Sequence, residues 1–439
     1  MSRSWFLVGV AAVLTLSTAC DPATNTSASG GSGGSGGSQG GNGAGTNTGG
    51  TAGEDGVGGF GGIGPAGGNG GGQTGNTCES DPDEDFDEDG FSVTNGDCND
   101  CDKNVNPGAV EVIITEPGPD GMVPQAADED CDMVIDNVAV ACDDNLAIGD
   151  SDAFHGANAI ELCQKATAAD QKWGVLDAKY VRANGSGVPA ALQYGIMNKF
   201  GNAVNVQAGQ RMLALSAGNA RDLDDPSPCG TQSCQVTGAG TAPPNFPQQI
   251  CNASPLIYDD VALDLKIRSP KNATGYSFNF RFTSFEYSEW VCTSYNDQFI
   301  ALVNPAPPGS INGNISFDSL NNPVSVNIGF FDVCAPETCD PSVFAMFCNA
   351  GCPQPPVPCC PSGPAELAGT GFDAWGDAGG TSWLKTQAPI QGGQEVNIRF
   401  TIWDAGDQNL DSTVLVDNFQ WIANGGTVAI GTVEVPEPK

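Results

Sequence analysis

The sequence predicts a mainly β protein whose largest domain is an antiparallel, jelly-roll-like β-sandwich. From about residue 153 onward, short runs of β-branched and aromatic residues recur between turns rich in Gly, Pro and Asn. Several runs alternate apolar and polar residues, so the aromatic side chains of residues 276–282 share one face. Only residues 157–169 have a helical pattern. Short strands in this number are typical of sandwiches and jelly rolls.

The expected domain covers residues 142–430 and is followed by a tail at 431–439. Residues 334–360 are rich in Cys and Pro, which indicates a stapled loop inserted between strands. The predicted strands, in chain order, are 204–206, 212–215, 261–267, 276–285, 298–303, 324–331, 396–403 and 414–422.

The N-terminus has the pattern of an export signal. Arg3 precedes an apolar run of about a dozen residues, which is too short to span a bilayer. Small residues before Cys20 resemble the bacterial lipobox, in which the Cys is lipidated, although Leu16 lies four residues before Cys20 and not three. We therefore expect residues 1–19 to be a signal peptide and the exported protein to be anchored at the outer membrane or cell surface through lipid alone. Residues 20–77 then form the lipidated Cys and a flexible, disordered Gly- and Ser-rich linker.

The cysteine content also indicates export. Of the 17 cysteines, 16 follow Cys20, and an even number in an exported chain predicts disulfides. The cysteines of the insert should pair within their own loop. Adjacent Cys359 and Cys360 should have different partners, because a bridge between neighbours is strained. The insert cysteines are Cys334, Cys339, Cys348, Cys352, Cys359 and Cys360.

The charge of the chain excludes some partners. There are 52 acidic and 16 basic side chains, for a net charge of −36, which argues against nucleic acid and against docking on anionic lipid. Residues 78–152 contain 23 Asp and Glu but one basic residue, Lys103. These carboxylates would repel one another without a counterion. We therefore predict that residues 78–141 are a small, loop-rich segment that binds a hard cation.

The pattern Asp-x-Asp-x-Asp-Gly at residues 85–90 is typical of calcium loops. Alternate carboxylates in a tight loop converge on one point, the Gly permits the turn, and Phe91 would offer its backbone carbonyl. An EF-hand loop closes with an acid at its twelfth position, which here is Gly96, while Asp97 follows one residue later. The sequence thus predicts calcium but not a standard EF-hand.

The same segment resembles the MopE-type metal-binding motif of bacterial surface proteins. The resemblance lies in Gly-Asp-Cys-Asn-Asp at 96–100, Asn-Pro-Gly-Ala-x-Glu at 106–111 and Asp-x-Asp-Cys-Asp at 128–132. Cys101 and the long spacer 112–127 depart from the pattern. The resemblance implies calcium-type carboxylate sites and a bridge between Cys98 and Cys131. The candidate ligands are Asp85, Asp87, Asp89, Phe91, Asp97, Asp100, Asp128, Asp130, Asp132 and Asp136.

Copper, to which MopE itself is linked, does not suit this chain. Copper sites favour imidazole or sulfur ligands, and His155 is the single histidine. Export favours disulfides over thiolates, which argues against zinc as well.

Three stretches of the sandwich resemble the family called choice-of-anchor L, a domain of secreted and surface bacterial proteins. They are residues 212–220, 282–287 with 296–299, and 403–419; the family more often has Glu where Phe285 stands. The resemblance implies surface display and adhesion without catalysis. Acidic residues lie at the strand ends in these stretches, and two interpretations stay open: a calcium site beside the sheet, or Asp side chains that cap turns. These acids are Glu286, Asp297, Asp404, Asp407, Asp411 and Asp417.

We expect no enzyme, because the chain has one histidine and lacks the common nucleophile, zinc and phosphate-loop motifs. An adhesive module with a calcium-stiffened stalk is the leading hypothesis, and a structural envelope component is the alternative. A glycan or surface-protein ligand would contact Trp290 with Tyr287 and Tyr295. A weaker alternative is a glycoside hydrolase that uses Glu286 and Asp297.

Overall fold

The computed structural model describes residues 81–435 except 115–116, 118–120, 124, 138–140, 249–252, 292, 327–329, 336–359, 361, 375–377 and 424. The expected signal peptide, Cys20 and the whole linker lie outside the described residues, as do Cys339, Cys348, Cys352 and Cys359. Among the helices that are described, none has the length and apolar character needed to cross a membrane.

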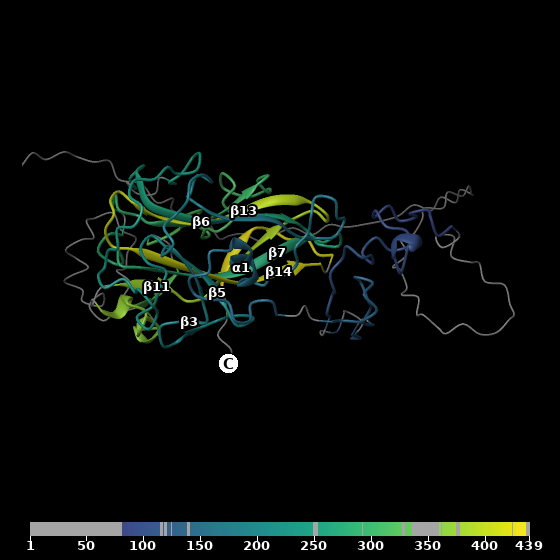
Figure 1. The fold of residues 1–439 in the computed structure, drawn as a ribbon, viewed down its shortest axis with the longest axis horizontal. Coiled ribbons are helices and arrows are strands. Elements are labelled where there is room, and N and C mark those ends of the chain that lie inside the picture. Colours follow the sequence, from purple (N-terminus) through teal and green to yellow (C-terminus); the bar gives the residue numbers. More distant parts are fainter. Residues whose placement is uncertain are drawn as a thin grey trace, which may run out of the picture. The chain divides into compact units, whose positions relative to one another are not determined.

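Two antiparallel sheets form the body of the protein, which confirms the predicted mainly β sandwich (Figure 1). The first sheet has the order β1 (Gly174–Val181), β6 (Ile257–Arg268), β13 (Glu395–Ala405), β8 (Gln298–Asn304) and β9 (Val324–Ser325). The second has the order β10 (Phe331–Cys334), β11 (Gly379–Thr381), β7 (Gly275–Ser284), β14 (Ser412–Ile422), β5 (Met212–Ser216) and β2 (Tyr194–Met197).

Smaller elements border these sheets. Strand β12 (Leu384–Pro389) pairs with β7 and with β15 (Gly431–Glu434), and β3 (Lys199–Phe200) pairs with β4 (Val204–Asn205). The helices are short: α1 (Ala153–Asn158), and the 3-10 turns η2 (Val93–Asn95), η4 (Ala365–Leu367) and η5 (Phe372–Ala374).

The core lies between the two sheets. As predicted, the aromatics of β7 point to one side: the Phe278 ring lies 4.9 Å from that of Phe400 on β13, and Phe280 lies 5.2 Å from Phe299 on β8. The other face of β7 is buried too, and there Arg281 forms an ion pair with Glu366. Strand β7 is therefore covered on both faces.

The helix predicted at 157–169 is wrong. The observed helix α1 covers Ala153–Asn158, and the side chain of Asp152 caps its start by accepting from Phe154 N at 2.9 Å. Glu161 has a φ of 69°, which a helix does not allow. The chain then turns into the Cys142–Cys163 disulfide.

Most predicted strands are present, but several boundaries differ. The stretch 324–331 is not one strand, because β9 ends at Ser325 and β10 begins at Phe331. Strands β1, β2, β3, β11, β12 and β15 were not predicted. Strand β1 has the sequence Gly-Val-Leu-Asp-Ala-Lys-Tyr-Val, which does not alternate regularly between apolar and polar residues. Its pairing register with β6 shifts between Val175 and Asp177.

The acidic segment has little regular structure, and hydrogen bonds join it to the sandwich. Val110 N donates to Asn272 Oδ1 (3.0 Å), and Asn272 Nδ2 donates to Val110 O (2.7 Å). Trp173 Nε1 donates to Ala109 O at 3.1 Å. The segment 106–111, which carries the Asn-Pro-Gly-Ala-x-Glu pattern, thus contacts the loop after β6.

Disulfides cross-link both the acidic segment and the sandwich domain. The Cys98–Cys131 bridge implied by the resemblance is present, and Cys334 pairs with Cys360 within the insert, as predicted. The sequence did not assign the bridges Cys142–Cys163 and Cys229–Cys234.

Candidate metal centre

Five carboxylates of the acidic segment converge, and we call them the first cluster: Asp85, Asp87, Asp89, Asp97 and Asp100. Asp87 joins two overlapping groups, one with Asp85 and Asp100 and one with Asp89 and Asp97. Within each group the candidate ligand oxygens lie within 4.8 Å of one another. All five residues were candidate ligands on sequence alone.

The turn at Gly90 positions the first three acids. Gly90 has a φ of 102°, a conformation that favours glycine, and its N–H donates to Asp85 Oδ2 at 2.8 Å. Asp87 Oδ1 accepts from Asp89 N (3.2 Å), and Asp89 Oδ1 accepts from Phe91 N (2.8 Å). These side-chain-to-backbone bonds fix each carboxylate.

Two acids from the following turns complete the cluster. Asp97 Oδ1 accepts from Asn99 N at 2.7 Å, and Asp100 Oδ1 accepts from Phe86 N at 2.9 Å. Each of the five acids therefore has one oxygen bound to a backbone N–H. The other oxygen of each is buried and has no hydrogen-bond partner; these are Asp85 Oδ1, Asp87 Oδ2, Asp89 Oδ2, Asp97 Oδ2 and Asp100 Oδ2.

Burial and mutual repulsion make the ionised form of this cluster costly. Burial, with the charges of Asp89 and Asp87 adding to it, raises the pKa of Asp97 to about 7. Burial and the charge of Asp89 raise the pKa of Asp87 to about 6, and burial also raises the pKa of Asp89. A cation at the centre would remove this cost. Five free carboxylate oxygens suit calcium, which takes six to eight oxygen ligands; the Phe91 carbonyl as a further ligand stays a prediction.

A second cluster is built around Glu111. Its carboxylate groups with those of Asp128 and Asp130, and also with those of Glu129 and Asp136, again with candidate oxygens within 4.8 Å of one another. Glu111 Oε2 accepts from Asp136 N at 2.9 Å, whereas Glu111 Oε1 is buried without a partner. Burial, together with the charges of Glu129 and Asp130, raises the pKa of Glu111 to about 8.

The candidate ligand list omitted two members of this second cluster, Glu111 and Glu129. Glu111 ends the Asn-Pro-Gly-Ala-x-Glu pattern, so the resemblance already contained the signal for it. Asp132, a candidate ligand, joins neither group: its Oδ1 accepts from Val134 N (2.7 Å) and its Oδ2 from Asn137 Nδ2 (2.6 Å). Asp132 instead shapes the turn.

The acids of the sandwich separate into two places. Asp417 lies six residues beyond Asp411 along β14, a displacement of about 20 Å in an extended strand. Its Oδ2 accepts from Gln207 N at 2.6 Å. Burial, with the charge of Asp417 adding to it, raises the pKa of Glu161. Glu286, Asp297 and Asp404 form the other group. Burial raises the pKa of Glu286 and of Asp404, and the charge of Asp297 adds to the shift of both.

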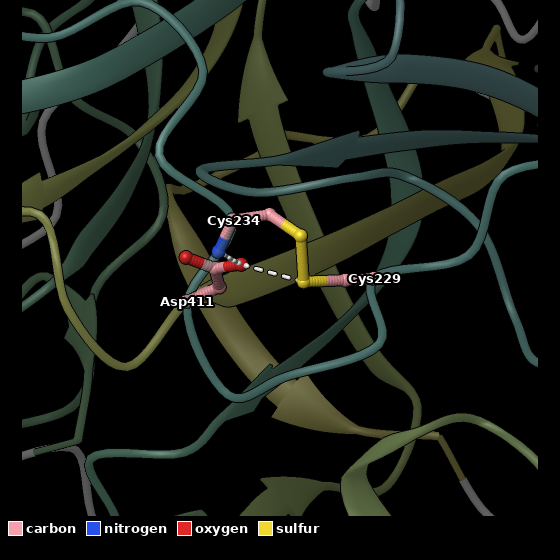
Figure 2. Close-up of side chains that lie close together, drawn as sticks. All are labelled: Cys229, Cys234 and Asp411. Atoms are coloured by element: carbon pink, nitrogen blue, oxygen red, sulfur yellow. Dashed lines mark hydrogen bonds between the residues drawn. A yellow bond between two sulfur atoms is a disulfide. The ribbon is translucent and has the colours of Figure 1, made fainter.

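Cys229 and Cys234 lie beside the carboxylate of Asp411 (Figure 2). The two sulfurs are joined in a disulfide, and the Cys234 N–H donates to Asp411 Oδ2 at 2.7 Å. A disulfide offers no thiolate, so this group does not form a zinc site.

A small pocket of about 160 Å³ lies at the end of the sandwich and is lined by Glu286, Trp290, Tyr295, Asp407, Asn409 and Leu410. The rings of Trp290 and Tyr295 meet edge to face, with centroids 5.1 Å apart. Both side chains are half-buried. Tyr287 was expected beside them, but this expectation is wrong: Tyr287 is 7% exposed and stacks on Phe331 at 4.3 Å. Its ring belongs to the same core cluster as Phe282 and Phe331.

Asp297 does not have the access that one of two sugar-cleaving carboxylates needs, although Glu286 lines the pocket. Both are buried, and Asp297 uses both oxygens, accepting from Ala405 N (2.9 Å) and from Ser412 Oγ (2.6 Å). In this conformation Asp297 has no oxygen left for a substrate.

The fold and these sites define a disulfide-stapled β-sandwich with acidic side-chain clusters. The model of the choice-of-anchor L domain matches residues 158–419, which is more than half of the chain, and the protein belongs to this family. Membership indicates a cell-surface, exported protein and no known enzymatic activity. No curated protein and no solved structure matches the chain.

Proposed function

We propose that the protein is a non-enzymatic, lipid-anchored surface protein of the outer membrane, that its acidic segment has the MopE-type arrangement, and that this segment binds calcium. One observation carries the calcium proposal. Five carboxylates each bind a backbone N–H through one oxygen and leave the other oxygen buried and without a partner. Hydrogen bonds of this kind position the acids before a cation arrives, so little ordering remains to oppose binding.

The sandwich serves adhesion or ligand binding in this proposal. The pocket beside Trp290 and Tyr295 favours this role over a purely structural one, since aromatic anchors are enriched at binding surfaces. A calcium-loaded segment that contacts the loop after β6 would present the sandwich on a stiff support. A structural envelope component would need the same cation but would not need the pocket.

Calorimetric titration of the purified protein with calcium, after treatment with chelator, tests the calcium proposal. The wild-type protein should give a binding heat that saturates as calcium is added. Its melting temperature should also rise with calcium, because a ligand that binds the native state adds stability. The variant Asp87→Asn with Asp89→Asn removes two acids from the first cluster and should lose at least one bound ion.

The matched control is Glu84→Gln with Glu88→Gln. It removes the same charge from two exposed positions of the same segment and should bind as the wild type does. The proposal is wrong if the Asp87 and Asp89 variant and this control bind equally well, or if neither calcium nor chelator changes the melting temperature of the wild type.

A further inference from the structure

A second pocket lies at the end of the sandwich opposite the pocket beside Trp290, and we call it the Tyr276 pocket. Its volume is about 360 Å³, which is within the range of about 300–1,000 Å³ that is usual for small-molecule sites. Tyr276 lies at the start of β7 and Val396 at the start of β13, and both line it. Glu286 and Asp407, which line the pocket beside Trp290, instead follow the ends of these two strands. The two pockets are therefore separate.

The walls of the Tyr276 pocket are apolar and uncharged. Eight of its eleven lining residues are apolar, and four of these are prolines: Pro305, Pro307, Pro308 and Pro389. Among the described residues, no acidic or basic side chain lines it, although the chain has 52 acidic side chains. A charged ligand would lose its hydration here without gaining a partner of opposite charge. The composition of the walls therefore favours a neutral ligand.

Prolines and hydrogen bonds hold these walls in place. The proline ring fixes φ, so the loop 305–308 after β8 has few alternative conformations. In the turn between β12 and β13, Gln391 N donates to Gln394 Oε1 at 3.1 Å, and Ser269 Oγ donates to Gln391 O at 2.8 Å. Because the walls are ordered before a ligand arrives, the entropic cost of binding is lower.

The hydroxyl of Tyr276 has no partner in the protein. Tyr276 is 1% exposed, and its hydroxyl oxygen is buried without a hydrogen bond. The ring is fixed, because it stacks on Phe419 at 5.4 Å and meets Trp421 edge to face at 6.2 Å. Burial raises the pKa of the hydroxyl, so it stays protonated and neutral. A buried tyrosine hydroxyl usually finds a hydrogen-bond partner, which here points to a group from outside the chain.

We propose that the Tyr276 pocket binds a neutral, mainly apolar small molecule that carries a single hydroxyl or carbonyl group. The apolar part of this ligand packs against the prolines and against Val303 and Val396, and its oxygen bonds to the Tyr276 hydroxyl. The pocket has the volume of about a dozen water molecules at about 30 Å³ each, which suits a compound of two fused rings.

This inference rests neither on calcium binding by the acidic segment nor on adhesion through the pocket beside Trp290. Its ligand is recognised by apolar contact and one hydrogen bond, whereas calcium needs several carboxylates. All binding measurements below are therefore made in chelator, so that failure of the calcium proposal leaves their outcome unchanged.

The probe is beta-naphthol, a neutral molecule of two fused rings with one hydroxyl, and its binding to the full chain is measured by equilibrium dialysis. Binding should saturate. Naphthalene, which lacks the hydroxyl, should bind about three- to tenfold more weakly, the size expected for one neutral hydrogen bond. Naphthalene sulfonate has the same rings and a negative charge, and it should not bind measurably.

Tyr276→Phe keeps the ring and removes only the hydroxyl. This variant should bind naphthalene as the wild type does and should lose the preference for beta-naphthol. Because it removes a buried polar group without a partner, its melting temperature should equal or exceed that of the wild type. A preference for beta-naphthol that persists in Tyr276→Phe would overturn the assigned role of the hydroxyl.

A second pair of variants places the probe in the pocket. Ala306→Phe fills the pocket from an exposed position of the loop after β8, so the fold should tolerate it while binding of beta-naphthol is lost. Val188→Phe adds the same ring at a position that is 83% exposed and outside the pocket, and it should bind as the wild type does. The inference is overturned if the wild type shows no saturable binding, if Ala306→Phe still binds, or if the sulfonate binds as well as beta-naphthol.

Discussion

Lys271 Nζ donates a hydrogen bond of 2.8 Å to the backbone carbonyl oxygen of Asp89, and so joins the sandwich to the acidic loop. The backbone N–H of Lys271 also donates to Gly108 O at 2.9 Å. Lys271, in the loop after β6, therefore binds two turns of the acidic segment. Because Asp89 belongs to the first cluster, a cation bound there acts on a loop that is already attached to the β-sandwich.

The first prediction concerns this attachment. Lys271→Met keeps the length of the side chain but removes the donor, and a hydrogen bond to a charged group is worth about 1.5–3 kcal/mol. Backbone amides of residues 86–110 should exchange hydrogen several-fold faster in the variant. Lys172→Met, at an exposed position, is the control and should leave the exchange unchanged. Equal exchange in all three proteins would show that Lys271 does not hold the loop.

The second prediction concerns the turn at Gly90. An alanine there must adopt a φ near 102°, which costs about 1–2 kcal/mol, and its Cβ would lie 3.2 Å from Lys271 Nζ. Calcium affinity of the first cluster should fall about tenfold, the equivalent of about 1.4 kcal/mol. Gly121→Ala is a matched control, because Gly121 has a φ of 77° and nothing within 4 Å of the added Cβ. Calorimetry should find its affinity unchanged; a similar loss in both variants would contradict the role of the loop geometry.

The third prediction concerns the Cys98–Cys131 disulfide, which connects the two clusters across 33 residues. Its removal by Cys98→Ser with Cys131→Ser should destabilise the acidic segment by about 3–4 kcal/mol, the chain-entropy value for a loop of this length. Calcium affinity should fall, since binding must then order the loop. Cys334→Ser with Cys360→Ser removes a bridge of the insert and should leave calcium affinity intact. Unchanged affinity in the first variant would show that the bridge is not needed to hold the clusters together.

The fourth prediction is a pH dependence that comes from Glu161 and Asp417. Burial, with the charge of Asp417 adding to it, raises the pKa of Glu161 from 4.5 to about 9, and burial raises the pKa of Asp417 from 3.8 to about 7. The folded protein therefore binds protons more tightly than the unfolded chain. The stability that this pair contributes is fully present at low pH, below both unfolded pKa values, and is lost as the pH rises through 7 toward 9.

In chelator, the melting temperature of the wild type should therefore fall as the pH rises between about 5 and 9. Glu161→Gln mimics the protonated acid and should make this fall shallower. The free energy of unfolding lost at the alkaline end should be smaller by more than about 1.4 kcal/mol, the equivalent of one pKa unit. Glu84→Gln, at an exposed position, should leave the slope unchanged. A slope that Glu161→Gln does not alter would show that Glu161 is ionised in the folded protein at neutral pH.

The sequence by itself determined the class of the fold, because alternation at 276–282 and the β-rich runs around it require sheets with one apolar face. It also determined the first cluster, since Asp85, Asp87 and Asp89 with Gly90 are local: the ligands of one turn lie within a few residues. The Cys98–Cys131 bridge followed from the resemblance, not from the spacing.

Only the tertiary structure decided which distant acids meet. Glu161 joins Asp417 because the chain after α1 turns sharply, and no local pattern encodes that contact. Asp404 and Asp411 interact electrostatically although β13 and β14 belong to different sheets. The partly exposed Trp290 and the buried Tyr287 belong to one short turn, and the sequence treats them alike. Tertiary contacts separate them: Tyr287 stacks on Phe331, which is distant in the sequence, whereas Trp290 packs against Tyr295 at the pocket.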